Sequence, residues 1–136
     1  MPVLKVLLTT SPDESTPNAV AVALTELTGR LLHKDRALTA VVIQCIDPDR
    51  WFVGGRRLSE TDLASFALDI EVTAGTNTKA EIAAYIDAVF TRMVELIGPV
   101  HEASYITAHE VPASTWGYGG RTQEFRFIAK TIQKAA

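Results

Sequence analysis

The sequence lacks the features that mark several large classes of protein. Its 136 residues include a single cysteine, so an intrachain disulfide framework is excluded. No run of 18 apolar residues occurs, which excludes a typical transmembrane helix, and the first residues lack the pattern of a signal peptide. The formal net charge of -3 is not the basic excess of a nucleic-acid-binding domain. We therefore expect a cytoplasmic protein that binds neither nucleic acid nor membrane.

The short motifs of common cofactor and metal sites are also missing. The sequence contains no GxGxxG, no phosphate-binding loop, no HExxH and no CxxC. Its three histidines, His33, His101 and His109, are not spaced as metal ligands. Cys45 ends an apolar, strand-like run, which predicts a buried thiol that packs and does not react. We expect neither a metal nor an organic cofactor.

What the sequence does contain is an internal repeat. Pro48 and Pro112 are 64 residues apart, and Trp51 and Trp116 are 65 apart. Each half has the order strand, helix, strand, and each ends in a similar stretch, "DPDRWFVGGR" or "VPASTWGYGGR". We predict a single domain over residues 1–136, made of two repeats (about 2–57 and 66–121) and a C-terminal tail. The tail "TQEFRFIAKTIQKAA" could form a closing helix.

Local patterns give the elements of each repeat. Residues 66–73 alternate between apolar and polar, as in a strand, and second strands are expected at about 38–45 and 103–109. Thr16-Pro17 and the capping-box pattern "TKAE" begin the two helices. The helices carry apolar stripes, formed by Val20, Leu24, Leu27 and Leu31 and by Ile82, Ile86, Val89, Met93 and Ile97.

A helix that connects two strands of one sheet makes those strands parallel. Two such β-α-β units predict an α+β fold, in which a four-stranded sheet carries both helices on one face. The Trp–Gly–Gly tails are too short for further helices and predict small hairpins.

Pro2 is the residue with the most chemical interest. A proline is tolerated at the first position of a strand, so packing alone could explain it. If Met1 is removed, however, Pro2 becomes a free secondary amine. A generic α-amino group has a pKa of about 7.7–8.0, and a low-dielectric pocket or nearby cations would lower it. Such an amine can act as a general base near neutral pH.

A β-α-β duplication that opens on Met-Pro resembles the tautomerase superfamily, which includes 4-oxalocrotonate tautomerase and macrophage migration inhibitory factor. The stretches "MPVLKV", "DPDRWFVGG" and "YITAHEVPASTWGYGG" carry the resemblance. It implies that Pro2 is the catalytic base. It also implies that Lys34 contacts a substrate carboxylate and that an adjacent chain contributes Tyr105. Thr107 stands where relatives have asparagine.

The resemblance further assigns Trp51 and Trp116 to the pocket wall. It implies a homotrimer with sites near subunit boundaries and an isomerase activity on a small 2-oxo acid or enol, dependent on loss of Met1. Plainer roles stay open: Lys34 could favour a helix C-terminus, and the three aromatic residues could only pack. Arg36, Arg50 and Arg121 are further cations that could bind a carboxylate or be solvated.

The sequence also departs from the superfamily. The stretches "TTSPDES" and "TAGTNTK" lack the arginine that short tautomerases have after the strand, and Phe66 replaces a second proline. Tyr118 stands where fused dehalogenases have an acidic residue. A second hypothesis is therefore a hydratase, dehalogenase or decarboxylase of a three-carbon acid. A third is a non-enzymatic trimeric binding module with a vestigial pocket.

Overall fold

The computed structural model describes residues 2–9 and 15–135. Its helices and strands, with short 3₁₀ helices labelled η, are in chain order β1 (Val3–Thr9), α1 (Ser15–Leu32), η1 (Arg36–Leu38), β2 (Ala40–Ile46), η2 (Pro48–Arg50), β3 (Phe52–Val53), β4 (Arg56–Arg57), η3 (Leu58–Glu60), β5 (Phe66–Thr73), α2 (Lys79–Ile97), β6 (Tyr105–Val111), β7 (Gly117–Tyr118), β8 (Arg121–Thr122) and α3 (Gln123–Ala135).

The four long strands form one mixed sheet in the order β2-β1-β5-β6. Each repeat supplies a parallel pair, β1 with β2 and β5 with β6, as the crossover helices predict. The two repeats meet through the antiparallel pair β1–β5, in which Leu4 faces Ile70 and Val6 faces Leu68. The strands of the second repeat therefore run opposite to those of the first. The predicted α+β fold is confirmed.

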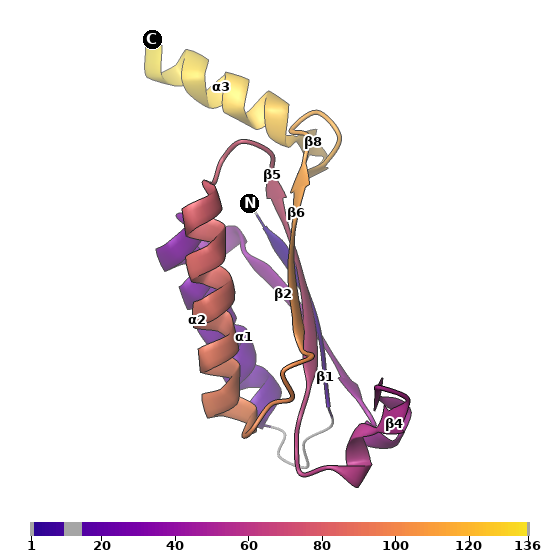
Figure 1. Ribbon diagram of the computed structural model, residues 1–136. Coiled ribbons are helices and arrows are strands. Elements are labelled where there is room, and N and C mark those ends of the chain that lie inside the picture. Colours follow the sequence, from indigo (N-terminus) through magenta and orange to yellow (C-terminus); the bar gives the residue numbers. More distant parts are fainter. Residues whose placement is uncertain (1, 10–14, 136) are drawn as a thin grey trace.

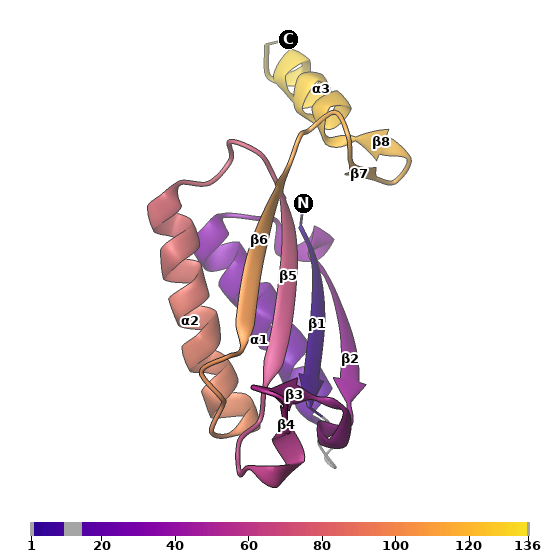
Figure 2. The ribbon, with the colours of Figure 1, turned by 45° about the vertical axis from the view of Figure 1, so that its right-hand side comes forward.

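Both long helices cover the same face of the sheet, and the other face is left open (Figures 1 and 2). The small hairpin β3–β4 follows β2 at one end of the sheet, and the hairpin β7–β8 follows β6 at the opposite end. These are the hairpins that the Trp–Gly–Gly stretches predict. No helix among the described residues is long and apolar enough to cross a membrane.

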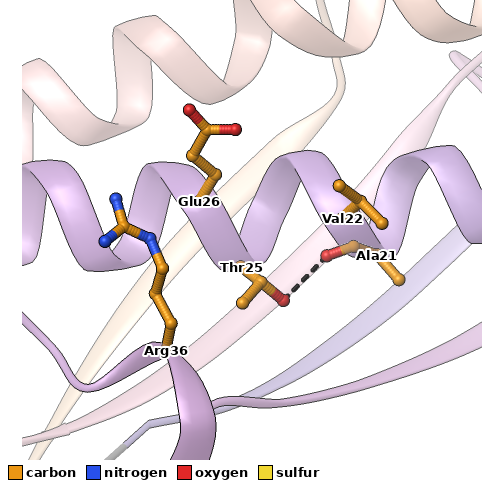
Figure 3. A pocket seen from close by; sticks show the side chains of 5 residues that line it. All are labelled: Ala21, Val22, Thr25, Glu26 and Arg36. Carbon is orange, nitrogen blue, oxygen red and sulfur yellow. Dashed lines mark hydrogen bonds between the residues drawn. The ribbon is translucent and has the colours of Figure 1, made fainter.

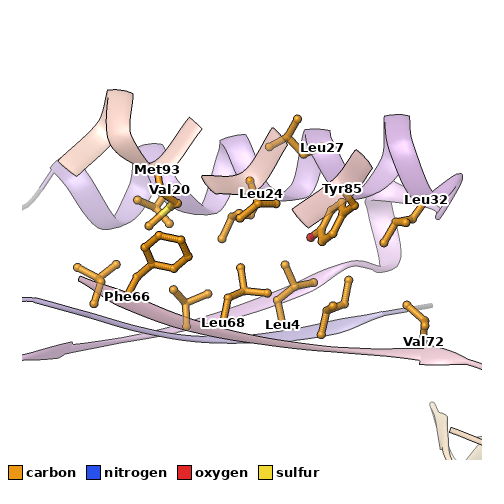
Figure 4. Packing of buried hydrophobic residues seen from close by; sticks show 14 residues of the cluster. Leu4, Val20, Leu24, Leu27, Leu32, Phe66, Leu68, Val72, Tyr85 and Met93 are labelled. Carbon is orange, nitrogen blue, oxygen red and sulfur yellow. The ribbon is translucent and has the colours of Figure 1, made fainter. Parts of the chain in front are cut away.

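The core lies between the helices and the sheet (Figure 4). Leu4 and Leu68 of the sheet and Leu24 of α1 are fully or almost fully buried there. Tyr85 of α2 is also buried, and its hydroxyl lies 2.8 Å from the Thr28 hydroxyl of α1, which itself donates to the Leu24 carbonyl. Burial raises the pKa of Tyr85 to about 12, although the bond to Thr28 opposes this. This polar pair ties the two helices together inside an apolar layer.

Both ends of α2 follow from the local sequence. Thr78 accepts from the Glu81 backbone N–H, and the Glu81 carboxylate accepts from the Thr78 backbone N–H, which confirms the predicted capping box. Gly98 ends the helix at φ 88°, a conformation that favours glycine. The apolar face of α2 is turned from the predicted stripe: Tyr85, Val89 and Met93 are buried, whereas Ile86 is exposed.

Two other expectations were wrong. Cys45 is exposed, because it lies near the end of the edge strand β2, which has only β1 as a neighbour. The C-terminal tail is a helix, but α3 does not close the fold. It projects from the end of the sheet beyond β6 (Figures 1 and 2).

Candidate active site

Pro2 lies buried at the end of the sheet where β1 begins. Its carbonyl accepts from the backbone N–H of Ala40, the first residue of β2, at 3.2 Å. Its neighbour Val3 pairs with Ala40 on one side and with Glu71, near the end of β5, on the other. The start of β1 is thus enclosed by the loop that precedes β2 and the loop that follows β5. Met1, whose removal would free the Pro2 amine, lies outside the described residues.

Those two loops are joined by side-chain hydrogen bonds. The Lys34 ammonium donates to the Thr76 hydroxyl at 2.9 Å, and that hydroxyl donates to the Thr73 carbonyl at 2.6 Å. The Asn77 amide donates to the Leu32 carbonyl at 3.0 Å. The loop after α1, which carries Lys34, is therefore held against the loop after β5. Together they fix the wall beside Pro2.

Lys34 has an unusual electrostatic setting for a lysine near the surface. Partial burial lowers the pKa of its ammonium group, and the Glu81 carboxylate partly opposes this. Within residues 2–9 and 15–135 this side chain forms one hydrogen bond, to the neutral Thr76 hydroxyl. An ammonium group has three donors, so Lys34 can also bind a carboxylate.

Glu81 connects this wall to the start of α2. The backbone N–H of Thr78 is the main cause that lowers the pKa of Glu81, which keeps the group an anion. Its carboxylate also lies 3.0 Å from Nε2 of His33. His33 adopts φ 59°, a left-handed conformation in which the chain turns away after α1. Sequence patterns identified the capping box but not these links of Glu81, Asn77 and Thr76 across the fold.

Trp116 lies at the same end of the sheet as Pro2, because β6 ends there and the residue precedes β7. Its indole N–H is buried and has no hydrogen-bond partner among the described residues. Arg126 of α3 stacks over the Tyr118 ring with its guanidinium carbon 3.8 Å from the ring centroid. The second aromatic–glycine hairpin therefore lies at the end of the sheet where β1 begins.

The other predicted site residues lie elsewhere in the chain. Trp51 precedes the hairpin β3–β4 at the opposite end of the sheet. Tyr105 begins β6 at that far end and is 68% exposed, while Thr107 lies midway along the same strand. One chain therefore brings together Pro2, Lys34 and Trp116 at one end of the sheet. It does not bring Tyr105, Thr107 or Trp51 to that end.

The described part of the chain contains no group of three or more His, Cys, Asp and Glu residues that could hold a metal ion. The groups gathered at this end of the sheet include the Lys34 ammonium, hydroxyls and amides that can donate hydrogen bonds, and also the Glu81 carboxylate with His33 beside it. Such a set can bind a carboxylate and can stabilise a negatively charged oxygen.

We compared the chain with known protein families, curated proteins and solved structures. No family model and no curated protein matches the sequence. Among solved structures, F6 fused 4-OT, an asymmetric trimer, has a TM-score of 0.78 at 16% identity and covers 91% of this chain and 98% of its own. Pt0534 inactivated by 2-oxo-3-pentynoate has a TM-score of 0.80 at 12% identity, with 91% and 98% covered. The chain has the tautomerase superfamily fold.

It has this fold in the fused, two-repeat form. A third solved structure, N1, a member of the cis-3-chloroacrylic acid dehalogenase family, has a TM-score of 0.75 at 17% identity. That match covers 98% of this chain and 96% of N1. A match of this extent includes at least part of α3.

Proposed function

We propose that this protein is a keto–enol tautomerase that acts on a small 2-oxo acid or enol, with Pro2 as general base and acid. The observation that carries the proposal is the half-buried Lys34 ammonium, held by Thr76 at the end of the sheet where β1 begins. A cation there can hold a substrate carboxylate and present the adjacent carbons to Pro2. The tautomerase fold supports the reaction class, and the 2-oxo inactivator of Pt0534 supports the substrate class.

The chemistry requires a neutral amine at Pro2. Once Met1 is removed, burial and the nearby Lys34 cation disfavour the ammonium form, so both lower the pKa of the amine. The nitrogen then takes a proton from the carbon next to the carbonyl. The electron pair of that C–H bond forms the carbon–carbon double bond of an enolate, and the carbonyl oxygen gains the negative charge. Protonation of this oxygen gives the enol, and the reverse sequence gives the ketone.

We further propose that the working unit is a homotrimer. Tyr105 is exposed on the open face of the sheet, far from Pro2 of its own chain. A neighbouring copy could supply the Tyr105 hydroxyl to the enolate oxygen, with Thr107 and Trp51 beside it. Trp116 would line the pocket from the same chain as Pro2. The trimer of fused 4-OT supports such an assembly.

The test is an ultraviolet assay of phenylenolpyruvate ketonisation. We expect Pro2→Ala to lower kcat/KM by about 100-fold or more, the usual contribution of a general acid–base group. Pro48→Ala, in η2 at the other end of the sheet, is the matched control and should keep full activity. Equal rates for the wild type and Pro2→Ala would refute the role of Pro2.

The mass of the mature protein is measured on the same samples. A retained Met1 makes the Pro2 nitrogen an amide, which is not a useful base. Full activity in a protein that retains Met1 would also contradict the mechanism.

The extended match to N1 favours a second candidate function, dehalogenation, hydration or decarboxylation of a three-carbon acid. Tyr118 replaces the expected acid, so water activation would need another group. Halide release from cis-3-chloroacrylate, without phenylenolpyruvate turnover, would favour this candidate. A trimer that binds 2-oxo acids and turns over neither substrate would indicate the non-enzymatic binding module.

A further inference from the structure

The C-terminal arm, residues 112–135, leaves an apolar helix face uncovered. Phe125, Ile128 and Ile132 recur at helical spacing along α3 and are 52%, 50% and 65% exposed. Figures 1 and 2 show the helix extending away from the sheet and from both long helices. Large apolar side chains in a continuous exposed row mark a surface that another molecule covers.

The arm is nevertheless internally well held. Backbone N–H groups of Gln123 and Glu124 donate to the carbonyls of Trp116 and Ala113, at 2.9 and 3.0 Å. The Arg126 guanidinium donates to the Tyr118 carbonyl at 3.0 Å while it stacks on that ring. α3 is therefore fixed to its hairpin and presents a rigid apolar face.

Charge favours a second copy of this chain as the molecule that covers it. Residues 112–136 contain four basic side chains and one acidic one, which gives the arm a net charge of +3. The rest of the chain has nine basic and fifteen acidic residues, a net charge of -6. An arm of one sign is attracted to a body of the other sign.

A groove on the outer side of α1 offers an apolar floor for a helix (Figure 3). It has a volume of about 480 Å³ and is lined by Ala21, Val22, Thr25, Glu26 and Arg36. Val22 is 61% exposed, which makes it the most exposed aliphatic side chain of the two long helices. Arg36 lies across α1 at Gly29, where an added Cβ would come within 2.7 Å of the Arg36 side chain. Among the described residues Glu26 has no salt bridge.

The order of the strands indicates which copy the arm reaches. The two edges of the sheet are β2 and β6, and they are different surfaces. In a closed ring of identical chains the contact is heterologous, so the β6 side of one copy meets the β2 side of the next. The arm follows β6, and the groove lies on α1, which precedes β2. The arm thus extends toward the α1 side of the next copy.

We propose that α3 of each copy packs Phe125, Ile128 and Ile132 into the α1 groove of the next copy. The inference rests on the ring assembly proposed above and not on the tautomerase reaction. Arg36 of the groove is two residues from Lys34. The docked helix therefore also covers the outer side of the loop that carries the candidate carboxylate-binding cation.

Disulfide trapping tests the contact directly. In a full-length Cys45→Ser background, a chain with both Val22→Cys and Ile128→Cys is oxidised and run on a non-reducing denaturing gel. We expect covalent dimers and trimers from the double variant and monomers from each single variant. The matched control combines Ile128→Cys with Ile86→Cys, in the groove of about 330 Å³ between α2 and β6, and should stay monomeric.

Each other outcome overturns the proposal. If only the Ile86→Cys, Ile128→Cys double variant gave linked chains, α3 would lie in the groove between α2 and β6 and not in the α1 groove. A monomeric band with an internal crosslink in the Val22→Cys variant would mean that α3 folds back on its own chain.

A second measurement does not depend on crosslinking. Ile128→Asp, at an exposed position, should raise the dissociation constant of the oligomer at least tenfold in sedimentation experiments, roughly the cost of losing an apolar anchor. Gln133→Ser, an uncharged change at an exposed position off the apolar row, is the control. An unchanged oligomer, with binding to anionic phosphatidylserine vesicles that Ile128→Asp abolishes, would identify α3 as a membrane-surface helix and refute the contact between copies. Phenylenolpyruvate turnover, measured separately, keeps failure of this contact distinct from failure of the proposed reaction.

Discussion

The two ends of the sheet are built by the same β-α-β unit, yet only one carries the candidate catalytic residue Pro2. At the first end the strand begins with Pro2, beside the Lys34–Thr76 bond. At the second end the equivalent position is Phe66, which is fully buried with its ring centroid 6.1 Å from that of Phe90. There the chain continues backwards through Ser65, whose hydroxyl lies 2.8 Å from that of Ser104. A strand that begins a chain can offer an amine, whereas one that continues a chain offers only an amide.

The largest expected effect comes from the residue that fills the second end. Phe66→Ala should lower the free energy of unfolding by about 3–5 kcal/mol, because it leaves a cavity in a closed core. Chemical denaturation measures this loss, and Phe52→Ala, at an exposed position in β3, is the control. Activity per folded molecule should be unchanged. A selective loss of kcat in folded Phe66→Ala would show that the second end also contributes to catalysis.

The two long helices also differ in the groups that they bury, and this difference should appear in the pH dependence of stability. The buried residues of α1 have no titratable group, whereas α2 buries the hydroxyl of Tyr85 in the core. The pKa of Tyr85 is raised from 10 to about 12 on folding, so its contribution is complete below pH 10 and is lost as the pH rises to 12. Two pKa units correspond to a loss of roughly 3 kcal/mol. Urea denaturation between pH 9 and 12 should show this step in the wild type and not in Tyr85→Phe.

At the end of the sheet where β1 begins, substitutions of Lys34 test its proposed role in binding the substrate carboxylate. Lys34→Ala should raise KM for a 2-oxo acid about tenfold or more, because the carboxylate loses its charged partner. Lys34→Arg should restore part of the binding. Lys79→Ala removes a charge at an exposed position at the start of α2 and should leave KM unchanged. Equal KM values for Lys34→Ala and the wild type would show that Lys34 does not bind the substrate carboxylate.

The smallest effect concerns the start of α2. Thr78→Ala removes half of the capping box and should cost about 1 kcal/mol of stability. Glu81 also contacts His33, which is next to Lys34 in the chain. Loss of the Thr78 cap should therefore also raise KM slightly, because it loosens the segment that carries Lys34. Thermal unfolding measures the first effect, and Thr91→Ala, at an exposed mid-helix position, is the control. A loss no larger than in Thr91→Ala would contradict the stabilising role of the capping box.

Local patterns in the sequence were enough to predict most of the fold. Period-two alternation predicted β5, the capping box predicted the start of α2, and the repeated Trp–Gly–Gly stretches predicted both hairpins. The exposed Cys45 was missed because an apolar run does not reveal whether its strand lies at an edge. The periodicity of the tail allowed a helix but did not reveal that α3 would leave the body.

The candidate site was less accessible to such reasoning. Pro2 and Lys34 were predicted through a resemblance, but Thr76 is 42 residues from Lys34 and no local spacing connects them. The contribution of Tyr105 from an adjacent chain and the place of Trp51 in a pocket wall stay predictions. Trp51 lies far from Pro2 because it follows β2, which runs parallel to β1. Tyr105 lies far from Pro2 because β5 and β6 run antiparallel to β1, a pairing that a list of elements does not contain.

Because β1 and β5 pair at the centre of the sheet, the two β-α-β repeats form two halves with one shared interface. The halves are joined by the β1–β5 ladder, by packing between α1 and α2 and by side-chain bonds such as Lys34–Thr76, apart from the segment around η3. If that segment were cleaved just before Phe66, the halves would stay associated through an interface already as buried as a core. The second end would then acquire an amino terminus at Phe66, a primary amine where loss of Met1 would give Pro2 a secondary one.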